Sequence, residues 1–167
     1  MNVSQLLAKE IEERIIICGI HRIIACLEQL EESHLHLRPN SNSNSINNLI
    51  LHLNGNVRQW LISSISTAPD ERQRDSEFDH QNKKTKTELI YLLNILEEDI
   101  KVLLPLIIDV DLTEVKEVQC FTETYLSIIV HTIEHFSYHV GQITYITKMI
   151  LDIDTGYYSG LDLDKTG

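Results

Sequence analysis

The chain has 167 residues, of which 43% are hydrophobic, and its formal net charge at pH 7 is -11. This length and apolar content predict one globular domain with a sizeable core and exclude a disordered chain. The acidic balance comes without a cluster of Lys or Arg, which argues against nucleic acid or an anionic membrane as the main partner. We expect the charge mainly to favour solubility.

The first predicted element is a long amphipathic helix over residues 3–30. Its apolar side chains recur at spacings of three and four residues for about seven turns. The stripe consists of Val3, Leu6, Leu7, Ile11, Ile15, Cys18, Ile23, Cys26, Leu27 and Leu30. We interpret its two cysteines as small core residues rather than nucleophiles. The longest apolar run, residues 15–20, is far too short to span a bilayer.

The cysteines and the N-terminal residues bear on the compartment. Cys18, Cys26 and Cys120 form an odd set without the spacing of a metal finger. The N-terminal residues lack the basic segment followed by an uninterrupted apolar one that marks a secretion signal. We therefore expect a cytoplasmic protein with free thiols.

A second helix follows the polar loop at residues 38–44. Asn44 or Ser45 can cap its first turn. Its apolar positions, which we expect to face inward, are Ile46, Leu49, Ile50, Leu53, Val57, Trp60 and Leu61.

A charged connector, residues 68–84, separates the second helix from the third. It could reach over one end of the packed helices. For its charged residues we favour salt bridges over substrate contacts, and these residues are Arg74, Asp75 and Glu77. The third helix carries an apolar stripe over residues 89–103 and should close before Pro105.

After residues 109–111, where a short extended piece fits, a fourth helix runs from about Thr122 to Leu151. We expect its apolar residues to face inward: Leu126, Ile129, Val130, Ile133, Phe136, Val140, Ile143 and Ile150. The tail, residues 152–167, is predicted to be loosely held, which leaves residues 1–151 as a single domain.

Four long helices with apolar stripes need one another to bury those stripes. This favours an all-α fold, an antiparallel four-helix bundle with its sites between facing helices. A homodimer through exposed helix faces fits such an architecture, and the sequence leaves the oligomeric state open.

His135 and His139 are the most informative pair in the sequence. Positions four residues apart project from one face of a helix, so the two imidazoles can reach a shared ion. Neutral imidazole is the commonest protein ligand for zinc, nickel or ferrous iron. His131 lies one turn earlier, but roughly 12 Å of helix rise separates it from His139, too far for easy sharing of one ion. The pair therefore needs a third ligand from another helix.

His52 on the second helix is the predicted third ligand. It borders the apolar stripe, and Asn56 follows one turn later on the same polar edge. Packed helices lie about 8 to 10 Å apart, so a histidine on one can meet a pair on another at one ion. Three nitrogens leave coordination positions open for water or substrate, as in catalytic sites.

Further residues are candidate supports for this site. Gln142 could hydrogen-bond a bound group, and Asn56 or Glu134 could orient a ligand imidazole by accepting its second N–H. We interpret His131 as a neighbour of the site and not as a primary ligand. We attribute Gly141 to close backbone packing, because glycine inside a helix normally costs roughly 1 kcal/mol relative to alanine.

Three segments resemble the DinB/YfiT-like superfamily. They are NSINNLILHLNGN at residues 44–56, RQRDSEF at residues 72–78 and HFSYHVGQI at residues 135–143. By the order and spacing of elements, the similarity covers roughly residues 5–150. The resemblance implies a four-helix bundle in which one histidine of the second helix and an H-x-x-x-H pair of the last long helix hold zinc, nickel or a related divalent ion. These positions match His52, His135 and His139.

The resemblance also implies a reaction class. Some relatives transfer low-molecular-weight thiols such as bacillithiol or mycothiol to electrophiles, and others are mycothiol-dependent isomerases. The connector Arg72–Phe78 is typical of a poorly characterised branch of the superfamily. The leading expectation is a divalent-metal-dependent enzyme that transfers a small thiol to a small electrophilic substrate, or hydrolyses that substrate.

Two other interpretations stay open. A non-catalytic metal-binding stress or interaction protein would be stabilised by metal but would not react with thiols and electrophiles. A helical scaffold with packed polar histidines would bind no stoichiometric metal. The sequence has no Gly-rich phosphate loop, no Gly-x-Ser-x-Gly elbow and no Cys-x-x-Cys pair, so nucleotide binding, serine hydrolysis and dithiol redox chemistry have little support.

Overall fold

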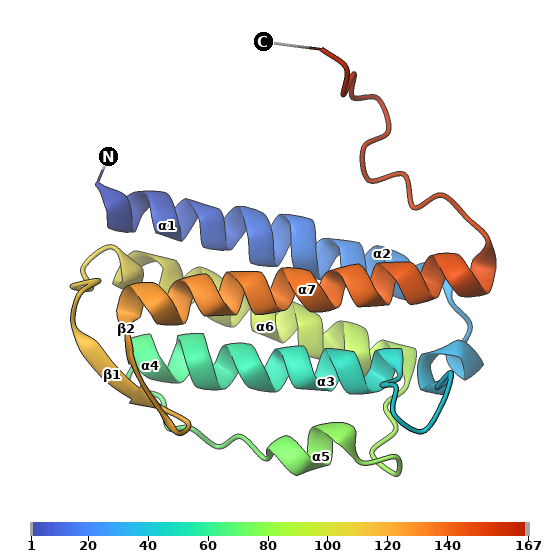
Figure 1. The fold of residues 1–167 in the computed structure, drawn as a ribbon, viewed down its shortest axis with the longest axis horizontal. Coiled ribbons are helices and arrows are strands. Elements are labelled where there is room, and N and C mark those ends of the chain that lie inside the picture. The colour runs from blue at the N-terminus through green and yellow to red at the C-terminus, as the bar shows by residue number, and fades with distance from the viewer. Residues whose placement is uncertain (1, 166–167) are drawn as a thin grey trace.

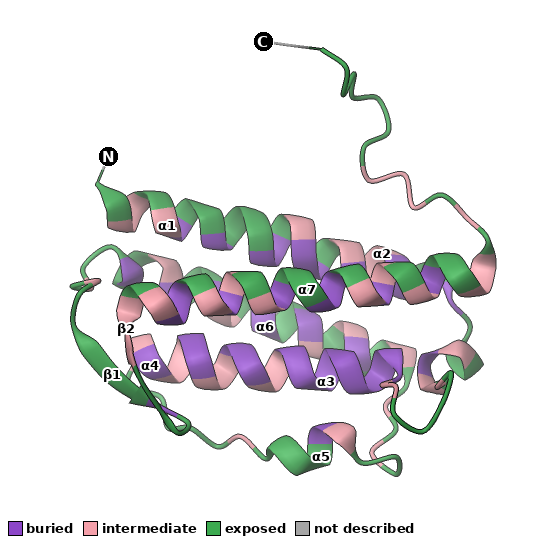
Figure 2. Ribbon diagram, viewed as in Figure 1, coloured by how far each residue is buried: buried purple, intermediate pink, exposed green. Residues whose placement is uncertain are grey.

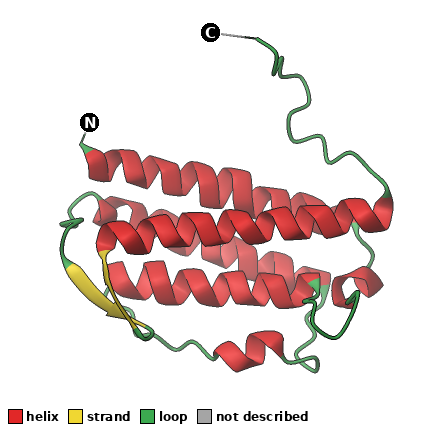
Figure 3. Ribbon diagram, in the orientation of Figure 1, coloured by secondary structure: helices red, strands yellow, loops and turns green. Residues whose placement is uncertain are grey.

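A computed structural model describes residues 2–165. Within this range the chain is mostly helical and carries one small two-stranded sheet (Figures 1 and 3). The elements are α1 (Val3–Ile11), η1 (Glu12–Ile20), α2 (His21–Gln29), η2 (Glu32–His36), α3 (Ile46–Val57), η3 (Arg58–Ile62), α4 (Ser63–Ile65), α5 (Arg74–Phe78), α6 (Lys86–Ile107), β1 (Val115–Val118), β2 (Phe121–Thr124) and α7 (Tyr125–Leu151). Apart from the small sheet, the prediction of an all-helical chain is confirmed.

The first predicted helix is one continuous segment made of α1, η1 and α2. Asn2 begins it with a capping box, because its side chain accepts from the Gln5 N–H and the Gln5 side chain accepts from the Asn2 N–H. The prediction that Val3 and Leu6 face inward is wrong, since both are exposed. Val3 and Leu6 lie roughly 140° and 160° around the helix from the buried Ala8.

Cys26 is buried, as a core residue should be, but Cys18 is only partly buried. The assignment of Cys18 to the core is therefore wrong, because it lies at the edge of the buried stripe. Cys120 is exposed, and all three cysteines are free, as the sequence predicts.

The second long segment consists of α3, η3 and α4. Ser45 caps α3, as one of the two predicted candidates: its hydroxyl accepts from the Asn48 N–H, and the Asn48 side chain accepts from the Ser45 N–H. Figure 2 shows α3 buried along most of its surface. The connector does not close an end of the fold but runs alongside α3, with α5 packed against it (Figure 1).

The third predicted helix, α6, passes through Pro105 and ends at Ile107, so the predicted end before the proline is wrong. Proline removes only the hydrogen bond that its own N–H would have donated one turn back, and little helix follows. The last turn tightens instead, with Ile108 N–H donating to the Pro105 carbonyl at 3.3 Å.

The extended piece expected after residues 109–111 is a hairpin. β1 and β2 pair antiparallel, with Val118 opposite Phe121. The turn places Gln119 at a positive φ of 54°. Residues 122–124 belong to β2, so α7 begins at Tyr125, after the Thr124 side chain accepts from the Ser127 N–H.

α7 packs against both the first segment and α3, and α6 contacts the same two segments (Figure 1). Their buried faces form one hydrophobic cluster that includes Phe136, Ile129 and Ile143 of α7. The inward prediction is wrong for Leu126 and Val130, which are 43% and 52% exposed. Both lie beyond one edge of the buried face, because α7 carries more apolar residues than one face can hold.

Within residues 2–165, no helix combines the length and the apolar character needed to cross a lipid bilayer.

Candidate metal centre

Three imidazoles from two helices meet between α3 and α7. His52 comes from α3, and His135 and His139 come from α7. One ring nitrogen of each lies within 4.8 Å of the other two, and the Nε2 atoms of His52 and His135 are 2.9 Å apart. His52 and His139 are buried, and His135 is half-buried. The structure thus brings together the three histidines chosen from the sequence.

Helix geometry accounts for this convergence. His135 and His139 are one turn apart on α7, and their ring centroids are 4.5 Å apart. The ring of His52 reaches across from α3 and lies 5.0 Å from each of the other two rings, edge-on to both. Because both helices are packed into the core, the rings have little freedom to separate.

Glu77 of α5 fixes the orientation of His52. Its Oε2 lies 2.9 Å from Nδ1 of His52, and its two oxygens accept from Nε and Nη2 of Arg72 at 2.7 Å and 2.8 Å. A carboxylate held by a guanidinium can only accept, so Nδ1 of His52 must donate and therefore carries the proton. The contact of 3.2 Å between Arg72 Nη2 and the same Nδ1 is therefore not a hydrogen bond.

This ion pair is buried, since the side chains of Arg72 and Glu77 are only 3% and 7% exposed. Burial alone would raise the pKa of Glu77, but hydrogen bonds and charge from Arg72 and His52 outweigh it and hold the pKa below its usual value. Arg72 also donates to Gln59 Oε1 at 2.9 Å. Glu77 is therefore an ionised, fully engaged acceptor for His52.

Gly55 makes room for this ion pair on the surface of α3. A Cβ at this position would overlap Glu77 Oε1 and lie 3.0 Å from its Cδ and 3.1 Å from Arg72 Nε. A side chain here would push the carboxylate away from His52. Glycine is thus required at residue 55 by close approach and not by backbone conformation.

Gln142 fixes the orientation of His139 in a similar way. Its Oε1 lies 2.7 Å from Nδ1 of His139. An amide oxygen can only accept, so with this amide orientation Nδ1 of His139 carries the proton. Nε2 of His52 and Nε2 of His139 are therefore both unprotonated, so each has a lone pair that a metal ion can use.

Burial favours the neutral form of the two imidazoles on α7. Burial first, and then the neighbouring imidazoles, lower the pKa of His135 to about 3. Burial also lowers the pKa of His139, against the opposing effect of the hydrogen bond that its Nδ1–H donates to Gln142. Neutral imidazole is the form that binds a metal ion.

The donor set fits a divalent ion that prefers nitrogen ligands. Metal–nitrogen bonds of about 2 Å bring ligand nitrogens to roughly 3.5 Å from one another. Nitrogens that already lie within 4.8 Å need only small side-chain movements to reach this spacing. The outer hydrogen bonds of His52 and His139 to Glu77 and Gln142 are of the kind that fixes metal-binding imidazoles.

His131 lies beside the cluster but outside it. Its ring is stacked on His135 at a centroid distance of 5.4 Å and lies 4.0 Å from the ring of Trp60. Burial lowers its pKa despite the opposing charges of Glu134 and Glu123. Trp60 is held in turn by the hairpin, because its indole N–H donates to Gln119 Oε1 at 3.1 Å.

The other two predicted supports make no hydrogen bond to the three rings in the part of the chain that the structure describes. Glu134 is exposed on α7. Asn56 is buried, one helical turn beyond His52, and its Oδ1 has no hydrogen-bond partner. An orphaned buried acceptor beside the cluster is available to a bound group.

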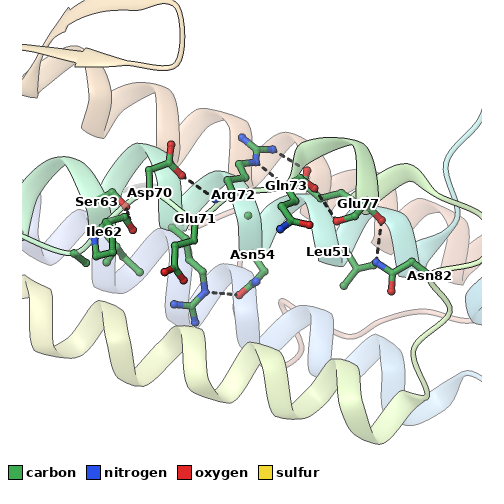
Figure 4. Close-up of a pocket in the computed structure, with 15 residues that line it drawn as sticks. Leu51, Asn54, Ile62, Ser63, Asp70, Glu71, Arg72, Gln73, Glu77 and Asn82 are labelled. Atoms are coloured by element: carbon green, nitrogen blue, oxygen red, sulfur yellow. Dashed lines mark hydrogen bonds and ion pairs between the residues drawn. The ribbon is translucent and has the colours of Figure 1, made fainter.

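A cavity of about 520 Å³ lies between α3 and the connector, and Figure 4 shows the side chains that line it. Arg72 and Glu77 line it, together with Gly55 and Gln73. The three histidines are not among its lining residues. Glu77 therefore both lines this cavity and contacts His52.

Sequence reasoning missed the orienting roles of Glu77, Arg72 and Gly55. Glu77 does form a predicted salt bridge, but its partner and its contact with His52 were not foreseen. The only signal was the charged connector itself, in which Arg74 instead packs over the ring of Phe78 at 5.1 Å.

Comparison with known proteins gives one match. The model of a family described as a protein of unknown function, DUF1572, matches residues 9–159. No curated protein and no solved structure matches the chain. The matched span includes all three histidines, the connector and the first part of the tail. The chain therefore belongs to the DUF1572 family.

Proposed function

We propose that His52, His135 and His139 hold one divalent metal ion, with zinc or nickel as the best candidates. The observation that carries this proposal is the convergence of three imidazole nitrogens, one from each histidine, within 4.8 Å of one another. Two of them have their other nitrogen already fixed by a hydrogen bond from Nδ1. Imidazole suits both metals, and availability decides between them.

The packing of the long helices supports a finer assignment of the fold. We assign it as an antiparallel four-helix bundle of the DinB/YfiT-like type, formed by the α1–α2 segment, the α3–α4 segment, α6 and α7. In such bundles the metal site lies between facing helices, as the histidines do between α3 and α7.

For the reaction, we propose metal-dependent transfer of a low-molecular-weight thiol to a small electrophile, or hydrolysis of that electrophile. When bound, the metal supplies Lewis acidity, which stabilises a thiolate or hydroxide near neutral pH. Three protein ligands leave coordination positions open for these groups.

The protein's own residues supply orientation. Glu77 and Gln142 hold the Nδ1 protons of His52 and His139. With Nε2 of His52 unprotonated, the 2.9 Å contact to His135 is a hydrogen bond donated by His135 Nε2–H. Ligation requires His135 to carry its proton on Nδ1 instead. Asn56 Oδ1 is free to accept from a bound small molecule.

The test of turnover compares zinc-loaded and nickel-loaded protein with His139→Ala. Loss of the free thiol of bacillithiol or mycothiol in the presence of a small alkyl halide, and hydrolysis of small esters and amides, are followed for each sample. The proposal predicts turnover that disappears with His139→Ala. Stable metal binding without turnover on any of these substrates would favour a non-catalytic metal-binding protein.

A further inference from the structure

A second cleft, of about 490 Å³, lies between the first helical segment and α7. Its walls include Arg14, Cys18 and Arg22 from one side and Gly141, Thr144 and Lys148 from the other. Tyr157 and Tyr158, from the segment after α7, also line it. Its volume is in the range of small-molecule sites.

This cleft is separate from the histidine cluster. Gly141 follows His139 by two residues, which turns it roughly 200° around the helix. The imidazole of His139 and the bare backbone at Gly141 therefore lie on nearly opposite sides of α7. None of the three histidines is among the residues that line the cleft.

The charge of the cleft is opposite to that of the protein. The chain carries a net charge of -11, yet Arg14, Arg22 and Lys148 line this cavity and no Asp or Glu is among its lining residues. Arg14 also pairs with Glu10 at 2.9 Å, but both side chains are more than half exposed, so this pair is weak. Cations on both walls favour an anion between them.

Arg22 is held in place before any ligand arrives. Its guanidinium lies 4.5 Å from the ring centroid of Tyr157 and 5.4 Å from that of Tyr158. The Tyr157 hydroxyl is itself fixed, 2.9 Å from Thr144 Oγ1 and 3.2 Å from Cys26 Sγ. A charged group that is already ordered loses less entropy on binding a ligand.

Gly141 gives an independent indication of a ligand. From the sequence we predict that Gly141 allows close packing of a neighbouring backbone. This prediction is wrong, because a Cβ built at Gly141 meets nothing within 4 Å. It is not among the described glycines with positive φ. A glycine inside a helix is unfavourable relative to alanine, and here neither packing nor backbone conformation accounts for it. The open space above it lies in the cleft.

We propose that this cleft binds a small organic anion with at least two negative charges, a phosphate ester or a polycarboxylate. Arg14, Arg22 and Lys148 neutralise its charge. Because Gly141 has no side chain, the carbon skeleton of the bound anion can approach the backbone of α7 closely. The matched family span reaches residue 159 and so includes both tyrosines of this site.

Isothermal titration calorimetry of the full-length protein tests this proposal with glucose 6-phosphate and tricarballylate as probes and glucose as the neutral control. We expect saturable binding of at least one anion, none of glucose, and an affinity that falls with added salt. Preference for the first or the second probe distinguishes the phosphate ester from the polycarboxylate.

Variants separate the cleft from other sources of binding. Gly141→Leu fills the space without changing charge and should weaken the anion at least tenfold, whereas Gly141→Ala should keep most of the affinity. Lys148→Gln should weaken binding severalfold, and Lys116→Gln, on the exposed hairpin, should not. His139→Ala should leave anion affinity unchanged, which distinguishes this site from the metal centre.

Each alternative result overturns the proposal. No binding of either anion at 10 mM by the folded protein would do so, as would equal affinity in Gly141→Leu with an unchanged circular dichroism spectrum. If light scattering shows that Gly141→Leu changes the molar mass of the protein in solution while its anion affinity stays the same, this face is instead a contact between copies of the chain.

Discussion

The carboxylate of Glu77 lies 2.9 Å from Nδ1 of His52, and both of its oxygens accept hydrogen bonds from Arg72. The three residues form a buried chain of charge-assisted hydrogen bonds that runs from the connector to the histidine cluster. One ring of the candidate metal centre is therefore oriented by a segment more than twenty residues away in sequence.

This relationship predicts the effect of Glu77→Gln. The amide can still accept from His52, but it leaves the Arg72 guanidinium buried without a counter-charge. We expect the free energy of unfolding to fall by about 3 kcal/mol and the metal affinity to fall roughly 10- to 100-fold. Urea unfolding and competition with a chromogenic chelator measure the two effects. Glu98→Gln, on the exposed face of α6, is the matched control and should change neither.

The ligand assignment predicts a contrast among four histidines. Replacing His52, His135 or His139 with alanine removes a nitrogen of the cluster and should weaken metal binding sharply. His131→Ala removes a ring that is stacked outside the cluster and should weaken it much less. Chelator competition on all four variants measures this difference, and equal losses at the four positions would contradict the assignment.

Two glycines should respond in opposite directions to alanine. Gly55→Ala places a methyl group against the Glu77 carboxylate, so we expect a loss of about 1–3 kcal/mol in the free energy of unfolding. Gly141→Ala meets open space and should add about 0.5–1 kcal/mol. Thermal and urea unfolding measure both. Stabilisation by Gly55→Ala would show that Glu77 does not pack against α3 as described.

The pH dependence of stability follows from the lowered pKa of His135. Its pKa is about 3 in the folded protein against an ordinary value of 6.5. Between these values the unfolded chain binds the extra proton, so metal-free protein should lose stability as the pH falls below about 6.5. Glu77 acts in the same direction, but only below its ordinary value of 4.5.

Urea unfolding of metal-free protein at pH 7.5 and pH 5 measures this effect, because Glu77 contributes little in that window. His135→Gln cannot titrate and should lose less stability on going to pH 5 than the unchanged chain. His36→Gln, on η2, should behave as the unchanged chain does. If His135→Gln loses as much stability between pH 7.5 and pH 5 as the unchanged chain does, groups other than His135 cause the pH dependence.

The sequence was informative where a local pattern decides the structure. The i, i+4 spacing of His135 and His139 on a strongly periodic helix fixes their common face, and the stripe on the second helix places His52 on the side that packs against them. The capping role of Ser45 was also readable, because its signal lies within one turn of chain.

The predictions from the sequence failed where the role of a residue depends on contact with a segment that is distant in the sequence. The orienting role of Glu77 depends on the connector running back along α3, and on the absence of a side chain at Gly55. Neither feature has a period or a motif. Leu126 and Val130 were misplaced for a related reason, since a helix with apolar residues on several faces does not reveal which face its neighbours cover.

We propose that three histidines of two helices hold one metal ion. Inductively coupled plasma mass spectrometry on protein without a histidine tag tests it directly, with the unchanged chain compared with His52→Ala and His139→Ala. We predict close to one zinc or nickel ion per chain in the first sample and little in the two variants. A folded protein that takes up no metal even after reconstitution, or variants that keep full occupancy, would contradict it.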